Sequence, residues 1–125
     1  TFFCADLASD LPFLADSSFD LVLAPLVMDY LADWSSVFRR FHRALKPGGH
    51  FVFSVAHPAF DAVYHKTQHY FAVEQVSALW KGFGPHVVVP THRRPLAEVL
   101  NPLVQSGFQL VQVLEPIPTP EFRLT

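Results

Sequence analysis

Two apolar runs stand out in the pattern of hydrophobic and polar residues along the chain. Phe19–Ala24 is continuous apart from Asp20, and Phe51–Ala56 is a second run of the same kind. Such runs are typical of strands covered on both faces, as in a parallel sheet. Pro25 ends the first strand, because proline lacks the N–H that a ladder needs. The pattern therefore predicts two buried strands.

The segment between the two runs has helical periodicity. Its apolar stripe recurs with the spacing of successive helical turns and is made of Trp34, Val37, Phe38, Phe41 and Leu45. Asp33 is placed to cap the first turn, and Pro47-Gly48-Gly49 stops the helix. Strand, helix and strand with short connections predict a right-handed crossover between parallel strands.

The remaining segments are shorter and less regular. Residues 57–80 mix aromatic and polar side chains, which predicts an insertion over the sheet with a helical stretch at Val73–Trp80. Apolar residues at helical spacing predict a helix over Pro95–Ser106, with Pro102 bending or shortening it and Gly107 stopping it. Further strands are predicted at Thr1–Ala5, Val87–Val89 and Phe108–Leu114.

Composition narrows the class of protein. The chain has 125 residues, 50% hydrophobic and 16% charged, which predicts one domain with a core. No apolar run approaches the roughly 20 residues that span a bilayer, and the first residues lack the basic region of a signal peptide. Cys4 is the single cysteine, which favours the cytoplasm. A net charge of −2, with the basic residues on one solvated helix face, argues against nucleic-acid binding.

Ligand contacts are expected at one edge of the sheet. Ligands of open parallel sheets bind beyond the carboxyl ends of the strands, and that rule selects Ala5–Leu7, Ala24–Met28 and Ala56–Pro58. His57 follows a buried strand at this edge, and His92 lies just before the later helix. Either imidazole is suited to act as a general base near neutral pH. The alternative for His57 is a hydrogen-bonded turn residue.

Several motifs carry a family resemblance. Ala5-Asp6-Leu7, Phe19-Asp20-Leu21-Val22 and Leu45-Lys46-Pro47-Gly48-Gly49 together resemble the type 11 pattern of class I S-adenosylmethionine-dependent methyltransferases. The second half is more loosely similar to a small-molecule subgroup, at segments such as His57-Pro58 and Glu115-Pro116. The resemblance implies an α/β fold with a Rossmann-like, doubly wound sheet. It makes residues 1–125 a partial methyltransferase domain, with a small lid inserted at about residues 57–90.

The resemblance assigns one set of residues to the cofactor, S-adenosylmethionine. It implies that Asp6 accepts a hydrogen bond from the adenine amino group and that the Leu7 backbone meets the ring edge. Ala24, Pro25 and Leu26 match the segment that lies along the methionine part of the cofactor. The alternative for Asp6 is an acid that caps the following turn.

The methyl acceptor is expected beyond the same edge. Met28 and Tyr30 line the predicted pocket, although core packing is the alternative for both residues. Arg93 is predicted to hold an anionic group of the acceptor, unless it forms a salt bridge instead. His65 and His69 lack a third ligand, so no metal site is predicted. Tyr64 is also predicted to contact the acceptor. A lid that excludes water is predicted from four aromatic residues, for which packing within the insertion is the alternative: Tyr64, Tyr70, Phe71 and Trp80.

The resemblance also implies that part of the family domain is missing. In the family, the glycine-rich loop and the acid that holds the ribose lie before residue 1, and the final strand lies beyond Thr125. We therefore expect this chain alone to bind S-adenosylmethionine weakly or not at all. We also expect exposed strand edges, which favour aggregation or a homo-oligomer.

The predicted function is methyl transfer from S-adenosylmethionine to a small-molecule acceptor. Two alternatives stay open at this point. A nicotinamide-dependent oxidoreductase uses a similar sheet, and a fold does not fix a function. A non-catalytic binding or assembly module would also be consistent with a missing cofactor loop.

Overall fold

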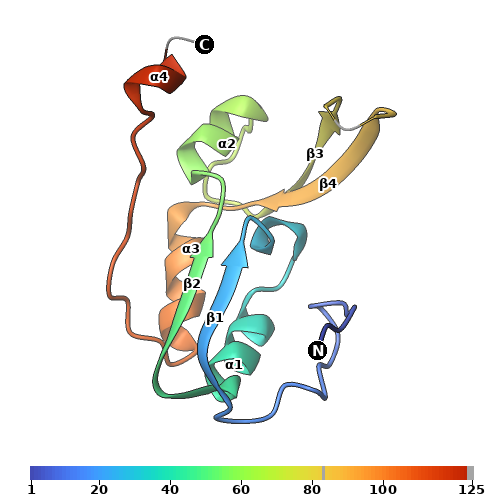
Figure 1. Ribbon diagram of the computed structural model, residues 1–125. Coiled ribbons are helices and arrows are strands. Elements are labelled where there is room, and N and C mark those ends of the chain that lie inside the picture. The colour runs from blue at the N-terminus through green and yellow to red at the C-terminus, as the bar shows by residue number, and fades with distance from the viewer. Residues whose placement is uncertain (83, 124–125) are drawn as a thin grey trace.

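The computed structural model describes residues 1–82 and 84–123, and Figure 1 shows how its elements are arranged. In chain order these are β1 (Phe19–Pro25), η1 (Met28–Tyr30), α1 (Ser35–Ala44), β2 (Leu45–Ser54), α2 (Pro58–Tyr64), β3 (Glu74–Trp80), β4 (Val87–Arg93), α3 (Leu96–Gln105) and α4 (Pro120–Arg123). Within these residues, none of the helices combines the length and the apolar character needed to cross a bilayer.

The first strand, helix and second strand form the predicted crossover. β1 and β2 pair in parallel, with Val22 opposite Phe51 and Ala24 opposite Phe53. The ladder is irregular at its start, because the Lys-Pro-Gly-Gly segment bulges out after the Leu45 pair. Gly49 is needed in this bulge, since a Cβ there would lie 3.0 Å from the Lys46 carbonyl oxygen. The predicted strand order and parallel direction are confirmed, whereas α1 already ends at Ala44 and the Pro-Gly-Gly segment predicted as a turn lies in an irregular part of β2.

The hydrophobic core lies on one face of this strand pair. α1 and α3 pack against that face (Figure 1), and the buried residues of the cluster are Ala24, Met28, Trp34, Val37, Phe38, Phe41, Val99 and Leu103. On the opposite face, Leu21, Leu23 and Val52 are 54%, 63% and 51% exposed. The expectation that the strands are covered on both faces is therefore wrong for the part of the chain that the structure describes.

The two long helices follow their sequence signals. Asp33 Oδ1 accepts a hydrogen bond from the Ser35 N–H at 2.9 Å, as a capping acid does. α3 continues past Pro102 and ends at Gly107, whose φ of +99° is left-handed. The N–H groups of Gly107 and Phe108 donate back into the last helical turn, which is the usual glycine stop.

The segment Val73–Trp80 is a strand, so its prediction as a helix is wrong. β3 pairs antiparallel with β4, from Glu74 opposite Arg93 to Trp80 opposite Val87. The predicted strand at Val87–Val89 is confirmed and is longer than expected. Its β-branched residues supply a ladder partner, and this pairing outweighs the weak helical pattern of the preceding segment.

Two other predicted strands, Thr1–Ala5 and Phe108–Leu114, are not strands in the structure. Neither segment pairs with another strand among the described residues, and without a ladder an extended segment is not a β-strand. Phe108–Leu114 instead continues as an extended tail whose Val111 is 82% exposed. Within the same residues β1 and β2 pair only with each other, so each keeps an open edge.

Candidate functional site

The carboxyl ends of β1 and β2 meet at one edge of the sheet, beside η1 and the start of α2 (Figure 1). The Leu26 N–H donates to the Ser54 carbonyl oxygen at 3.0 Å and lies 3.2 Å from the Ser54 hydroxyl. The Ala56 N–H donates to Asp29 Oδ2 at 3.3 Å. The structure therefore brings together two of the three predicted ligand segments, those that follow the two strands.

Leu26 marks this edge with an unusual backbone. Its φ is +50°, in the left-handed region that side chains other than glycine rarely adopt. The side chain is 62% exposed, so packing does not explain the conformation. Such strain concentrates at functional sites, where the surroundings enforce it.

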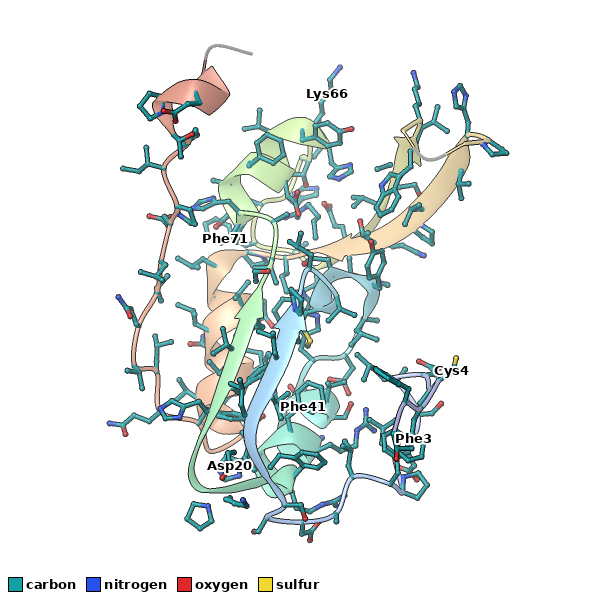
Figure 2. All side chains as sticks on the ribbon, in the orientation of Figure 1. Phe3, Cys4, Asp20, Phe41, Lys66 and Phe71 are labelled. Atoms are coloured by element: carbon teal, nitrogen blue, oxygen red, sulfur yellow. The ribbon has the colours of Figure 1, made fainter. Side chains whose placement is uncertain are left out.

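The third predicted segment borders the same edge across an open apolar hollow of about 450 Å³. Ala5 and Leu7 line it from the N-terminal segment, and Ala24 and Pro25 line it from the end of β1. Phe3 and Phe41, both labelled in Figure 2, also contribute to its wall. Three of the five predicted cofactor residues, Leu7, Ala24 and Pro25, thus share one surface.

Asp6 is held by the turn that follows it. Its carboxylate accepts hydrogen bonds from the Ala8 N–H at 2.9 Å and the Ser9 hydroxyl at 3.4 Å. The Leu7 carbonyl oxygen accepts a hydrogen bond from the Arg40 guanidinium. The turn-capping role weighed for Asp6 is thus present in the structure, and its contact with adenine stays a prediction.

His57 uses both ring nitrogens. Nδ1 accepts from the Ala59 N–H at 3.1 Å and so caps α2. In the neutral ring Nε2 then carries the proton, and it donates to Glu115 Oε1 at 2.6 Å. The alternative of a hydrogen-bonded turn histidine is therefore what the structure shows, and a base role requires Nδ1 to leave the helix cap.

Two predicted acceptor contacts are buried away from the edge. Met28 is fully buried in the core cluster, so it packs the interior instead of lining a pocket. Arg93 is also buried, and its guanidinium binds Glu74 at 2.8 Å together with the carbonyl oxygens of His69, Tyr70 and Ala72. Its charge and its donors are used inside the protein, which corrects the prediction that it binds an anionic acceptor.

The other predicted acceptor residues lie apart. Tyr30 and Tyr64 are exposed, on η1 and at the end of α2, and Tyr64 stacks on Phe60 with ring centroids 5.8 Å apart. His92 sits on β4, and its Nδ1 is buried without a hydrogen-bond partner among the described residues. Of the predicted lid residues, Phe71 is exposed, whereas the Tyr70 hydroxyl accepts a hydrogen bond from the Leu96 N–H at 3.2 Å.

Asp29 was not among the predicted site residues. It lies on η1 at the carboxyl edge, where burial raises the pKa of its carboxyl group and the nearby Asp61 raises it further. Burial also raises the pKa of Asp61 on α2. The position of Asp29 four residues after the end of β1 was the signal that could have identified it, because that position places a carboxylate at the ligand edge.

Comparison with known proteins adds an independent observation. A family model described as a methyltransferase domain matches residues 1–53. A candidate S-adenosylmethionine-dependent methyltransferase from Listeria monocytogenes aligns at a TM-score of 0.73 and 25% identity, over 88% of this chain and 56% of that protein. An S-adenosylmethionine-dependent methyltransferase from Mesorhizobium loti aligns at 0.65 and 31% identity, over 94% of this chain and 56% of that protein.

The first 53 residues are thus similar to the methyltransferase-domain family, and the chain shares its fold with two S-adenosylmethionine-dependent methyltransferases. It spans about half the length of the two methyltransferases that it matches in structure, which agrees with a partial doubly wound sheet. No curated protein matches the sequence. Within the described part of the chain, no three His, Cys, Asp or Glu side chains are grouped as metal ligands would be.

Proposed function

We propose that this methyltransferase domain transfers a methyl group from S-adenosylmethionine to a small-molecule acceptor. The observation that carries the proposal is the open apolar hollow that runs along β1 to its carboxyl end, whose lining includes Leu7, Ala24 and Pro25. Its residues fit the cofactor, because an apolar wall can cover a flat base and a thioether chain. The neighbouring Asp6 carboxylate is exposed and can accept a hydrogen bond from an amino group.

When bound, S-adenosylmethionine supplies an electrophilic sulfonium methyl group. The contribution of the chain is to bind and orient the reactants and to exclude water between them. Tyr30 and Asp29 on η1, together with Tyr64 on α2, are the side chains that we assign to the acceptor. An acceptor that loses an O–H or N–H proton needs a base, for which His57 and His92 are the candidates.

The cofactor assignment is tested by calorimetric titration of S-adenosylhomocysteine. We expect binding by a chain extended to the full length of the family fold, and weak or absent binding by residues 1–125 alone. In the extended chain, Ala5→Trp fills the hollow and should abolish binding. Ala8→Trp is the matched control, because Ala8 is exposed and does not line the hollow.

The outcomes of the titration test the proposed function and the location of the cofactor separately. No binding by the extended chain would refute the proposed function. Binding that survives Ala5→Trp would place the cofactor elsewhere. Once an acceptor has been found, His57→Ala tests the base role, because turnover that is unchanged at saturating acceptor would exclude His57.

A further inference from the structure

The η1 turn (Met28–Tyr30) carries Asp29 and Tyr30 at the ligand edge, yet it has little structure of its own. It contains one short 3₁₀ turn, in which the Tyr30 N–H donates to Val27 at 3.3 Å and the Leu31 N–H donates to Met28 at 3.0 Å. A helix this short does not hold its shape alone, because its hydrogen-bond geometry is poor and nucleation is unfavourable. Its position must come from other side chains.

Two buried side chains hold the two ends of the turn. Trp34 is 1% exposed, and its indole N–H donates to the Met28 carbonyl oxygen at 2.8 Å. Arg94 is 5% exposed, and its Nη2 donates to the carbonyl oxygens of Leu31 at 2.8 Å and Ala32 at 3.3 Å. The first residue of the turn and the two residues after it are thus bonded from outside.

The same two side chains are bound to each other. The Arg94 guanidinium lies 3.9 Å above the centre of the Trp34 ring, a cation–π distance. Burial lowers the pKa of the Arg94 guanidinium, and the carboxylates of Asp29, Asp33 and Glu98 oppose that shift. The charge of Arg94 is therefore balanced in part by Asp29, a residue of the turn that it braces.

We call Trp34 and Arg94 the brace of the η1 turn. Through Arg94, the brace is connected to the β3–β4 hairpin. Arg94 follows the last residue of β4, and its neighbour Arg93 binds Glu74 and the backbone of residues 69–72. Successive residues of an extended chain point in opposite directions, so two adjacent arginines hold two different segments. The end of β4 thereby joins the β3–β4 hairpin to η1.

We propose that Trp34 and Arg94 act as positioning residues, fixing the η1 turn so that Asp29 and Tyr30 face the methyl acceptor. The inference rests on the proposed function for the identity of the ligand, but not for the brace itself. Neither side chain touches the acceptor, and both act through the turn. A displaced turn would carry a carboxylate and a phenol away from the reacting edge, and small misplacements of this kind lower rates strongly.

Amide hydrogen exchange on the full 125-residue chain tests the brace without cofactor or acceptor. Trp34→Phe keeps an aromatic ring and removes the indole N–H. Arg94→Lys keeps the charge and removes the planar guanidinium, which lies over the Trp34 ring and whose Nη2 donates to two carbonyl oxygens. We expect either variant to lower the protection of the Tyr30 and Leu31 amides about tenfold relative to the amides of β1 and β2, which corresponds to the loss of one net hydrogen bond.

Leu103→Val is the control for general destabilisation. Leu103 is buried in the same core. It lies near the C-terminal end of α3, whereas Arg94 lies just before the N-terminal end of that helix. This variant should lower protection across β1, β2 and η1 together. Equal protection of η1 in wild type, Trp34→Phe and Arg94→Lys, measured relative to β1 and β2, would overturn the proposal.

A second readout concerns the Asp29 carboxyl group and is measured by NMR titration. Burial raises its pKa in the wild-type protein. In Arg94→Lys the positive charge remains, so release of the turn should bring the pKa of Asp29 down toward its ordinary value, and Leu103→Val should leave it unchanged. An unchanged pKa in Arg94→Lys would contradict the brace. Failure of S-adenosylhomocysteine to bind the extended wild-type chain would instead remove the proposed function and leave both of these results standing.

Discussion

The strained backbone of Leu26 can be measured against a residue of the same type. Leu23 and Leu26 are 63% and 62% exposed, and they lie three positions apart on either side of the end of β1. They differ in backbone conformation, because Leu23 pairs within the ladder and Leu26 has a φ of +50°. Leu23→Gly and Leu26→Gly therefore form a matched pair.

The terms shared by the two variants cancel. Both replacements lose a similar amount of partly buried leucine surface, and both make the unfolded chain more flexible by about 0.4–1 kcal/mol. Only Leu26→Gly relieves a left-handed conformation, which costs a non-glycine residue about 1–2 kcal/mol. Leu23→Gly also weakens a strand position. We expect Leu26→Gly to be less destabilising than Leu23→Gly by at least about 1 kcal/mol.

Urea unfolding of the two variants and the wild-type chain measures this difference, provided that the slopes of the transitions agree. Equal losses of stability would refute the argument, because they would show that Leu26 carries no backbone strain. Titration of S-adenosylhomocysteine into the extended chain then measures whether the strain at Leu26 affects binding. If the strain serves the cofactor segment, Leu26→Gly should weaken binding although the backbone conformation remains accessible to glycine.

Two further predictions concern other parts of the fold. Gly107→Ala should destabilise the chain by about 1–2 kcal/mol in urea unfolding, because Gly107 has a left-handed φ and an added Cβ would lie 3.0 Å from His42 Nε2. Gly82→Ala, where a Cβ would meet nothing within 4 Å, is its control, and equal effects would contradict the argument. Because burial raises the pKa of Asp29, its ionisation opposes folding: the carboxyl group is most favourable below about pH 4, and that benefit is lost as pH rises through the raised pKa. Asp29→Asn should therefore gain stability relative to wild type between pH 4 and 7, and a pH-independent difference between the two proteins would contradict this.

The first half of the fold could be predicted because its signals are local. The apolar runs of β1 and β2, the stripe of α1 and the glycine turn each depend on residues close in sequence. Their order then leaves a single handedness for the crossover. The family model matches this same region, residues 1–53.

The second half could not be predicted in the same way, because its structure depends on distant partners. β3 is a strand only because β4 pairs with it, and Phe108–Leu114 remains extended without a partner strand among the described residues. Sequence periodicity does not reveal whether a ladder partner is present. The likeness in structure to two methyltransferases still covers 88% and 94% of the chain, so this half also belongs to the shared fold, although its local signals are weaker.

The same contrast between local signals and distant contacts applies to the candidate site. The segments at the strand ends could be located from the rule for parallel sheets, but the direction of each side chain could not. Met28 and Arg93 were assigned to ligands by position, whereas the Met28 side chain turns into the core and the Arg93 side chain binds the loop before β3. Arg94 was overlooked because an arginine beside a proline has no distinctive pattern. Its importance comes from Trp34, which is sixty positions earlier in sequence and 3.9 Å away in space. The residues that hold this site in shape are thus the ones that local sequence reasoning is least able to find.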